Sequence, residues 1–511
     1  MTLEELKAAV RTAAALRLVQ TLQPIGGAGD KVFPPTYAGG IYATETRRID
    51  GEAIPCVLLN SVQSEANGLE EALQDAFLPD WRELKETSDA PVCGLPVIAV
   101  KVKGYDWVTS LTAPHRIHDA ILRDSIDENE TPFRDTGVGQ AIVKARVHDA
   151  TAFYKHCPTA LLFGTWDSTA GEGLNSAKIP RAVVSEIIGV NVVAGVRTAS
   201  RVDPLRIQRM GLTFYQKGQS GWTFDESEAD RKYKKAGSKQ GKTEWTLDID
   251  QAEKDKNGKP TKSEAIVAGG KPSDINHGNV TPDIDRFKKV RKNKLDVLPD
   301  ILTSNPVRLK YDVEAWDGHM ESRLDINSQT ARIRENVPRP GGVTMDHARH
   351  TWTLSLTQLR RLRFPGFPPP EGQKKEDVRP RQDEAARTVL AALALYALAL
   401  RQDEGYWLRS RCDLVPEKGN EAKLEIVGGA GGDIPLGAAA NVKATMLDPA
   451  LKEAESLGVE WTKTLLRLTP SPQLSQLVKL SDARVSGQDE SDTDAPEGTD
   501  NGADGDAGAS D

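Results

Sequence analysis

The stretch at residues 218–300 most constrains the fold, because it contains too little apolar material to join a hydrophobic core. Apolar residues thin out there, lysine becomes dense, and Gly, Ser and Asn are frequent. Core-like patterns lie on both sides and resume with "WTLSLTQLRRLRF" at 352–364. A segment poor in apolar surface stays solvated while its flanks pack. We therefore expect a discontinuous α+β core of residues 1–217 and 301–480, interrupted by a lysine-rich polar insertion at 218–300.

The end of the chain is strongly acidic. After Arg484 there are nine acidic residues and no basic one. The whole chain of 511 residues has a formal net charge of −8, so residues 1–484 carry +1. A segment rich in Gly, Ser, Ala and Asp cannot bury enough apolar surface to offset its chain entropy. We expect residues 481–511 to form a disordered acidic tail.

Cysteine spacing and hydropathy indicate a cytoplasmic protein. The four cysteines stand far apart, without the C-x-x-C spacing of a zinc ribbon, and do not suggest a disulfide framework. The only long apolar run, Val389–Leu400, is too short to span a bilayer. It predicts a buried helix, and we expect no membrane association.

Local patterns predict several elements near the start of the chain. Thr2 and Glu5 have the spacing of a capping box before an amphipathic helix. Asp50 and Gly51 stand between two extended runs and predict a β-hairpin whose second strand is Ile54–Leu59. The segment 16–22 is compatible with the end of the first helix or with a strand.

Further along the chain, the patterns are shorter. Residues 97–102 and 141–147 are expected to be extended, and between them lies a long polar excursion rich in His, Arg and Asp. "RAVVSEIIGVNVV", beginning at Arg181, alternates as a strand does.

The loop "LQPIGGAGDKVFPPTYAGG" at 22–40 contains glycines that could approach an anion closely. It is not a nucleotide-binding P-loop, because Asp30 precedes Lys31 and two prolines forbid a helix immediately afterwards. A purely structural turn is the alternative. The residues that could contact an anion are Gly26, Gly27, Gly29 and Lys31.

The junction "CVLLNSVQSEANGLEEAL" is a more specific candidate, because a strand runs directly into the start of a helix that extends to about Leu78. Free N–H groups, the helix dipole and short polar side chains could form a phosphate site there without a lysine. The alternative is that Ser61 or Ser64 is only the helix N-cap. The candidate residues are Ser61, Gln63, Ser64 and Asn67.

Two lysine-rich runs lie in the polar insertion. "RKYKKAGSKQGK" (231–242) contains six basic residues, and "RFKKVRKNK" (286–294) also contains six. Such runs bind polyanions through counterion release, or they are simply solvated loops. The lysines singled out are Lys232, Lys234, Lys235, Lys288, Lys289 and Lys292.

Motifs for catalysis or metal binding are absent from the sequence. His115/His118 and His347/His350 have i, i+3 spacing, which could place both imidazoles of a pair on one helical face, but no H-E-x-x-H motif exists. There is also no G-x-S-x-G elbow for a hydrolase nucleophile. We therefore expect no enzyme activity, no metal and no cofactor.

Five blocks together resemble a known protein family. They are "LQPIGGAGDKVFPPTYAGG", "RRIDGEAIPCVLLNSVQSEANGLEEAL", "LTAPHRIHDAILRDS", "RAVVSEIIGV" and "LSLTQLRRLRFP". In this order they resemble the RAMP-superfamily backbone subunit, of the Cas-seven type, of type I-G (formerly I-U) CRISPR Cascade complexes. The similarity covers roughly residues 15–210 and 340–415, and little of it falls on the insertion or the tail.

The resemblance implies a core like an RNA-recognition motif, a ferredoxin-type βαββαβ arrangement with inserted "thumb" and "finger" elements. It implies that several copies line up along one CRISPR guide RNA, beside other Cascade subunits, and leave its bases free to pair with target DNA. Such a protein contacts phosphates and 2′-hydroxyls rather than base edges.

The resemblance also assigns guide-phosphate contacts to Ser61, Gln63, Ser64 and Asn67. The usual basic residue of this turn is missing, so the positive charge would come from Arg47, Arg48 or the insertion. The glycine loop would have a supporting role against nucleic acid.

An RNA-cleaving RAMP protein is the alternative function. A nuclease that processes guide precursor would need a general base, for which His115 and His118 are the first candidates. A target-cleaving enzyme would need a loop carboxylate, such as Asp119, Asp124 or Asp127. Nothing in the sequence favours either over a binding loop.

Overall fold

The structure is a computed structural model of the whole chain. It divides into two compact units, Met1–Thr198 with Ile284–Ser475, and Ala199–Asp283 with Gln476–Asp511. The bounds predicted from the sequence for core, insertion and tail remain predictions. The described residues are 1–37, 41–78, 81, 94–167, 178–195, 198–201, 213–218, 221–237, 244–267, 280–284, 288–291, 294–297, 341–429 and 433–485.

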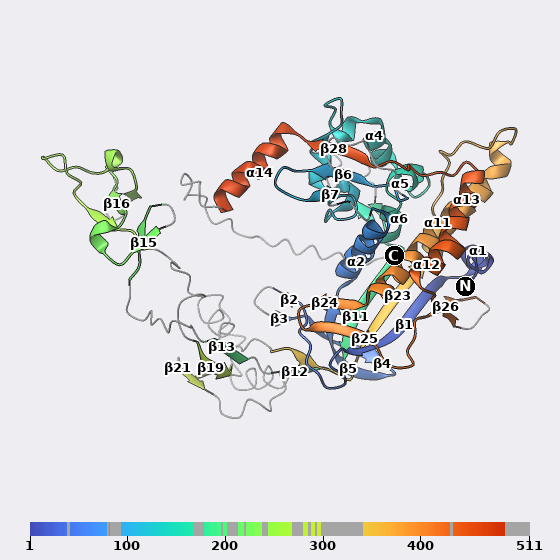
Figure 1. Cartoon of the computed structure of the whole chain (residues 1–511), viewed down its shortest axis with the longest axis horizontal. Helices are drawn as coiled ribbons and strands as arrows, with labels where there is room; N and C mark the ends of the chain where they lie inside the picture. Colours follow the sequence, from blue (N-terminus) through green and yellow to red (C-terminus); the bar gives the residue numbers. More distant parts are fainter. Residues whose placement is uncertain are drawn as a thin grey trace. The chain divides into compact units, whose positions relative to one another are not determined.

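A nine-stranded sheet is the framework of the first unit (Figure 1). Its main path has the order β24-β25-β1-β23-β11-β5-β4, while β26 pairs with β1 and β27 with β26, and every pairing is antiparallel. The strands are β1 (Ala15–Pro24), β4 (Thr44–Ile49), β5 (Glu52–Asn60), β11 (Val183–Val190), β23 (His347–Ser355), β24 (Tyr406–Arg409), β25 (Cys412–Pro416), β26 (Lys423–Val427) and β27 (Ile434–Pro435).

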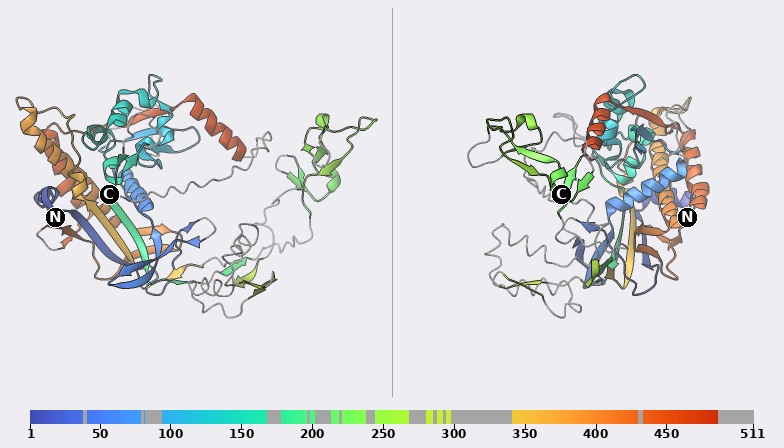
Figure 2. Two further views of the ribbon diagram at one scale, coloured as in Figure 1. Left: turned by 180° about the vertical axis from the view of Figure 1, so that it is seen from behind. Right: turned by 60° about the vertical axis from the view of Figure 1, so that its left-hand side comes forward.

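One face of this sheet is covered by helices. Along β1 the even-numbered side chains are buried, and on β23 Trp352 and Leu354 lie in the same core as Leu16 and Leu18. Helices α1 (Leu3–Thr12), α2 (Val62–Phe77) and α11 (Lys375–Glu404) contribute the other side of that core. Figure 2 shows the blue helix α2 and the orange helix α11 on the same side of the sheet. The sheet therefore packs as a helix-covered layer.

Helix α11 is apolar over its middle, as predicted for Val389–Leu400. Its residues from Val389 to Ala399 are all buried, between the sheet, α2 and the shorter helices near the C-terminal end of the unit. Those helices are α12 (Ala439–Val442), the π-helical turn Lys443–Leu447 and α13 (Asp448–Ser456). The short helix α10 (Leu356–Leu359) instead packs against α1 and β1. Among the described helices, none is both long and apolar enough to cross a membrane.

A second, smaller sheet with short helices shares the same hydrophobic core. Its strand order is β7-β6-β28-β8, and β28 pairs in parallel with β6. The strands are β6 (Ile98–Lys101), β7 (Trp107–Thr109), β8 (Ser125–Ile126) and β28 (Leu466–Pro470). The helices beside it are α3 (Ala120–Arg123), α4 (Gly137–Lys144), α5 (Thr151–His156) and α6 (Thr159–Phe163).

The extended segment predicted at 97–102 is confirmed by β6, but the one predicted at 141–147 is wrong. Residues Gly137–Lys144 form helix α4, capped by the Thr136 hydroxyl and with Ile142 buried. Short apolar runs do not distinguish a strand from a buried helical turn, and the tertiary environment decides between them.

The other local predictions near the N-terminus are confirmed. The capping box of Thr2 and Glu5 is present at α1, and residues 16–22 belong to a strand, β1. Asp50 and Gly51 both have positive φ, 50° and 87°, as a two-residue turn between β4 and β5 requires.

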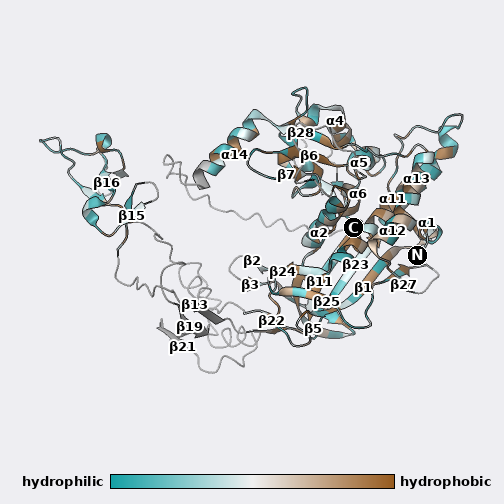
Figure 3. Ribbon diagram, viewed as in Figure 1, coloured by the Kyte–Doolittle hydropathy of each residue, from teal (hydrophilic) through white to brown (hydrophobic). Residues whose placement is uncertain are grey.

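Short strand pairs make up the remaining elements, and α14 (Pro472–Val485) follows β28. In the second unit β14 pairs with β15, and β17-β16-β18 form a small sheet that is mostly hydrophilic (Figure 3). The pairs are β2 (Thr36–Tyr37) with β3 (Ile41–Tyr42), β9 (Thr165–Trp166) with β10 (Lys178–Ile179), β12 (Val193–Ala194) with β22 (Val343–Thr344), β13 (Thr198–Arg201) with β19 (Val280–Ile284), β14 (Tyr215–Lys217) with β15 (Gly221–Thr223), and β20 (Lys288–Arg291) with β21 (Lys294–Val297). The small sheet contains β16 (Arg231–Lys234), β17 (Trp245–Thr246) and β18 (Ser263–Ala265).

Candidate nucleic-acid interface

The start of α2 is formed where β5 ends at Asn60. Ser61 is the N-cap, and its hydroxyl accepts a hydrogen bond from the Ser64 N–H at 3.2 Å. The alternative reading of Ser61 as a helix cap is therefore confirmed for this residue. The N–H groups of Val62 and Gln63, the first of the helix, have no acceptor in the described chain. Free N–H groups at a helix start attract anions.

The other candidate residues of this junction lie on the exposed side of α2. Gln63, Ser64 and Asn67 are all exposed, whereas Glu65 and Ala66 between them face the core. Helical periodicity places Ser64 and Asn67, three residues apart, on neighbouring positions of the same side. The structure thus brings amide and hydroxyl side chains and free backbone donors together at one helix start.

A buried polar network fastens this helix start to the sheet. The Glu65 carboxylate, only 1% exposed, accepts hydrogen bonds from Asn60 Nδ2 (2.5 Å) and Ser185 Oγ (2.7 Å). His350 Nε2 lies 3.5 Å from the same carboxylate. Burial by itself would raise the pKa of Glu65, but the hydrogen bonds and charge of His350, with the bonds from Ser185 and Asn60, lower that pKa to about 2.

The network continues from His350 across the sheet. Its Nε2 lies 2.9 Å from Ser185 Oγ and its Nδ1 lies 2.9 Å from the Tyr406 hydroxyl. The Ser185 hydroxyl donates to Glu65, and the Tyr406 hydroxyl donates to Gln20 Oε1 at 3.0 Å. Each ring nitrogen of His350 thus lies within hydrogen-bond distance of a hydroxyl oxygen. The network holds the buried Glu65 carboxylate directly under the first turn of α2.

A cation reaches α2 from a distant part of the chain. Arg401, near the C-terminal end of α11, lies against Gly68, where an added Cβ would be 3.6 Å from its Nε. Its Nη1 donates to the Gly405 carbonyl and lies 3.6 Å from the Glu404 carboxylate. Its Nε is buried without an acceptor in the described chain. Gly68 and Ser64 are four residues apart, so Arg401 approaches the same side of the helix.

The glycine loop is not part of this junction. Each strand from β1 through β23 and β11 to β5 is antiparallel to the next, so β1 and β5 run in opposite directions. The loop after β1 and the helix after β5 therefore leave toward opposite ends of the sheet. Gly27 and Gly29 have positive φ, 91° and 83°, and form an exposed turn with Gly26.

Lys31 lies where the chain leaves the core toward the insertion and returns from it. A Cβ at Gly342 would be 2.7 Å from Lys31 Cγ, and one at Gly195 would be 2.8 Å from Lys31 Cε. Val32 bridges to Val343, and the two glycine segments exchange backbone hydrogen bonds. Lys31 thus packs against Gly195 and Gly342, which adjoin the paired strands β12 and β22, and its stem has a structural role there.

The two arginines of the β4–β5 hairpin differ in their surroundings. Arg47 Nη1 lies 2.7 Å from Glu186, and its Nε lies 2.5 Å from Glu45. The hydrogen bond that Arg47 donates to Glu186 raises the pKa of Arg47 despite partial burial, and the one that it donates to Glu45 adds to this. Arg48 is exposed and donates to the Gly51 carbonyl at 3.1 Å. Arg48 is the more accessible cation of the two.

The lysines of the insertion lie partly in ion pairs. Lys232 is 3.7 Å from Glu264 and 4.8 Å from the Trp245 ring centroid, and Lys234 is 2.7 Å from Glu253. Lys235 bridges to Ala252 through its backbone. Lys288 and Lys289 lie on β20, and Lys292 lies outside the described residues.

The histidines and acids considered for a nuclease have structural contacts. His118 is buried, with Nδ1 3.9 Å from Asp167, and burial lowers its pKa to about 4. It is therefore not a base on a polar, accessible segment, as the sequence had suggested. His115 is exposed, and its backbone N–H donates to the Asp119 carboxylate at 3.1 Å.

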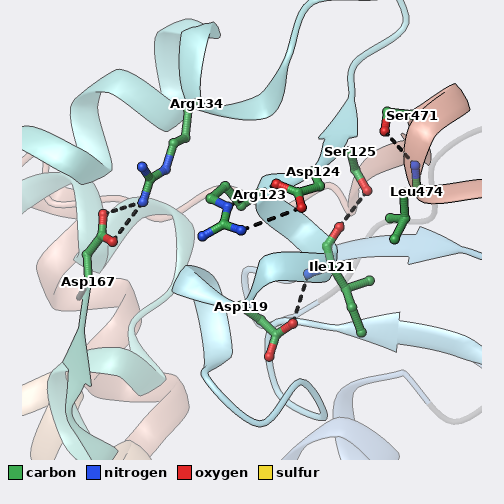
Figure 4. Close-up of polar contacts among 9 residues, drawn as sticks. All are labelled: Asp119, Ile121, Arg123, Asp124, Ser125, Arg134, Asp167, Ser471 and Leu474. Atoms are coloured by element: carbon green, nitrogen blue, oxygen red, sulfur yellow. Dashed lines mark hydrogen bonds and ion pairs between the residues drawn. The ribbon is translucent and has the colours of Figure 1, made fainter. Parts of the chain in front are cut away.

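The three carboxylates act within turns and caps. Asp119 caps α3 by accepting from the Ile121 N–H at 2.9 Å, and Asp124 pairs with Arg123 at 2.9 Å (Figure 4). Asp127 accepts from two backbone N–H groups of its own turn.

The prediction that His347 and His350 could share a helical face is wrong. Both lie on strand β23, where residues three apart point to opposite faces, and only His350 is fully buried. Among the described residues, no group of three or more His, Cys, Asp or Glu side chains is placed to hold a metal ion.

Sequence reasoning did not connect Glu65, His350, Ser185 and Arg401 with this junction. A histidine at a buried position of an alternating strand, and an acid on the buried side of a helix start, were the available signals. The contacts of Ser185 with Glu65 and with His350 join residues that are 120 and 165 positions apart, and the sequence does not predict contacts over such separations.

A comparison with protein families bears on this junction. Residues 16–194 match the model of the family described as CRISPR-associated protein GSU0053. The match supports a CRISPR-associated protein family and suggests a role in CRISPR defence. It includes β1, the β4–β5 hairpin, α2 and β11, and so the entire helix start, but neither His350 nor Arg401. No curated protein matches the chain.

Proposed function

We propose that this protein is the guide-RNA-binding backbone subunit of a type I Cascade complex, of the type I-G kind, and that it is not an enzyme. The observation that carries the proposal is the α2 start, where free N–H groups lie beside exposed Gln63, Ser64 and Asn67 inside the segment that matches the CRISPR-associated family. CRISPR-associated proteins work with CRISPR RNA, and this helix start suits its phosphates.

The order of elements supports a RAMP-type core. Along the chain, β1, α2, β11, β23, α11 and β25 occur in the order βαββαβ. The β4–β5 hairpin is inserted before α2, and the elements β6 to β10 and α3 to α6 are inserted between α2 and β11. In the sheet the four strands have the order β25-β1-β23-β11, with both helices on one face. The connection from β11 to β23 contains the lysine-rich insertion.

The chemistry of the α2 start fits a guide of any sequence. Backbone N–H groups, a hydroxyl and amides recognise phosphate and 2′-hydroxyl groups without selecting a base. Arg401 supplies a cation beside Gly68, in place of the basic residue that the turn itself lacks. In this proposal further copies of the chain and other Cascade subunits are the protein partners, and target DNA is bound through pairing with the guide.

The test is a comparison of two double variants in guide binding. Ser64→Ala with Asn67→Ala removes two exposed side chains of the junction, and Asn441→Ala with Thr445→Ala removes an exposed amide and hydroxyl elsewhere. We expect the first pair to weaken binding of three unrelated guide sequences by a similar factor, since each lost bond to a phosphate is worth about 1.5–3 kcal/mol. The second pair should bind as the wild type does.

Equal affinity of both variants and wild type, with folding intact, would contradict the proposed interface. The wild-type protein should also leave labelled guide precursor and target RNA uncut with and without Mg²⁺. Site-specific cuts that vanish in a His115→Ala or Asp124→Ala variant would instead establish the nuclease alternative.

A further inference from the structure

An exposed tryptophan lies beside a lysine on the strand pair β9–β10. Trp166 is 58% exposed, and Lys178 is its direct partner across the two strands. The Lys178 Nζ lies 5.7 Å from the centroid of the Trp166 ring. The other two residues of the pair, Thr165 and Ile179, are 8% and 3% exposed and face inward. The outer side of this strand pair is therefore an aromatic ring with a cation next to it.

Residues on both sides of Trp166 contact neighbouring elements. The following residue, Asp167, is 2% exposed and accepts two hydrogen bonds from Arg134, at 2.7 and 2.6 Å (Figure 4). Two residues before Trp166, the Gly164 carbonyl accepts from Arg116 Nη1 at 3.4 Å. Trp166 therefore lies between two residues that are hydrogen-bonded to arginines from other elements.

The same contacts connect Trp166 to the α2 junction. Arg116 donates two hydrogen bonds of 2.7 Å to Glu70, which is buried on α2. Glu70 follows Asn67 by three residues, so the two lie on adjacent positions of the helix. The strand pair that presents Trp166 is thus joined, through Gly164 and Arg116, to the helix that carries Asn67.

The chemistry of the pair fits a nucleobase better than a protein. Aromatic side chains stack on the bases of single strands, and a neighbouring cation contacts the adjacent phosphate. A tryptophan that anchors a protein interface is normally surrounded by further apolar contacts that exclude water. Within β9 and β10 the exposed neighbour is instead a lysine.

We propose that Trp166 is a base-stacking residue for the single-stranded nucleic acid bound at α2, and that Lys178 contacts its backbone. This rests on the proposed RNA-binding function, and adds to the phosphate contacts a sequence-tolerant contact with the base itself.

The experiment compares two probes of equal length, a uridine oligonucleotide and the same backbone with abasic sites. Wild type, Trp166→Ala and Trp166→Phe are titrated with each probe, and Trp407→Ala is the control because Trp407 is 68% exposed on β24. Thermal unfolding of each variant checks that the fold is kept.

We expect the wild type to prefer the base-bearing probe, and Trp166→Ala to lose about 5- to 150-fold affinity for that probe alone. Trp166→Phe should retain most of the preference, and Trp407→Ala all of it. A variant Trp166→Ala that keeps the preference, or a wild type that has none, overturns the stacking role while leaving RNA binding established. Loss of self-association in Trp166→Ala with unchanged RNA binding overturns it in favour of a protein contact. A wild type that binds neither probe contradicts the proposed function itself.

Discussion

Gly68 of α2 faces Arg401 of α11, and a Cβ at Gly68 would lie 3.6 Å from the Arg401 Nε. The two residues are 333 positions apart in the sequence, and their contact places a guanidinium beside the helix side that carries Ser64. Arg401 is 13% exposed, so its charge acts at close range on whatever binds at the helix start.

Replacing Arg401 with glutamine should weaken RNA binding. If Arg401 neutralises one phosphate, the slope of log K against log salt should fall by about 0.7 for a single strand. A salt titration of guide binding measures this, with Arg381→Gln as the control, since Arg381 is exposed on the same helix. Unchanged slopes for both variants would mean that Arg401 only supports the packing of α11 on α2.

Substitutions of Ser61 and Ser64 should have different effects on the stability of the fold. Ser61→Ala removes the α2 cap and should lower the free energy of unfolding by about 0.5–2 kcal/mol. The exposed Ser64 side chain has no such role, so Ser64→Ala should leave stability within about 0.5 kcal/mol of wild type. Urea unfolding of the two variants distinguishes them, and equal losses would contradict this assignment.

The Glu65 carboxylate should make stability depend on pH in the acid range. Its folded pKa of about 2 lies below the ordinary value of 4.5, so its contribution is fully present above pH 4.5 and is lost as the pH falls through 2. The shift corresponds to a contribution on the order of 3 kcal/mol. Glu65→Gln should therefore be much less stable than wild type near pH 7, and the difference should shrink toward pH 2.

The matched control is Glu71→Gln, because Glu71 is exposed on the same helix. Its stability should differ from that of wild type by less than about 0.5 kcal/mol at any pH in this range. A Glu65→Gln variant whose deficit stays constant from pH 7 to pH 2 would show that the ionised Glu65 carboxylate is not what stabilises the helix start.

Neutralising the lysines of the insertion should change affinity without changing sequence preference. Six replacements, at Lys232, Lys234, Lys235, Lys288, Lys289 and Lys292, would lower the salt slope by about 4 if all of them contacted RNA. We expect a smaller change, because Lys232 and Lys234 already lie near Glu264 and Glu253. A salt titration of guide binding by wild type and variant gives the number of lysines that contact phosphate. No change in slope or affinity would mean that the insertion does not face nucleic acid.

Removing residues 486–511 should leave the fold intact and tighten nonspecific nucleic-acid binding. Helix α14 ends at Val485, and the removed segment contains all nine acidic residues that follow Arg484. Without them, fewer negative charges compete with RNA for basic surface. Thermal unfolding checks that the fold is intact, and titration with an unrelated single strand checks the nonspecific binding. A clear drop in unfolding temperature would contradict the prediction that the fold is kept.

The sequence predictions that the structure confirms depend on residues that are close together along the chain. Asp50 and Gly51 determine a hairpin because a two-residue turn needs positive φ at both positions, and Thr2 with Glu5 determines a helix start through bonds within one turn. The apolar run in α11 could be recognised as a buried helix, because burial on all sides requires apolar residues on all sides.

Only the tertiary structure shows which distant side chains contact the first turns of α2. Glu65 is compensated by His350 and Ser185, and the cation beside Gly68 comes from Arg401. It also placed Lys31 between two glycines at the base of the insertion, away from α2, and made His347 and His350 part of a strand. Two-residue turns, helix caps and long apolar runs depend on neighbours along the chain, which the sequence records. Which distant side chains meet depends on how strands pair and helices pack, and no local pattern encodes that.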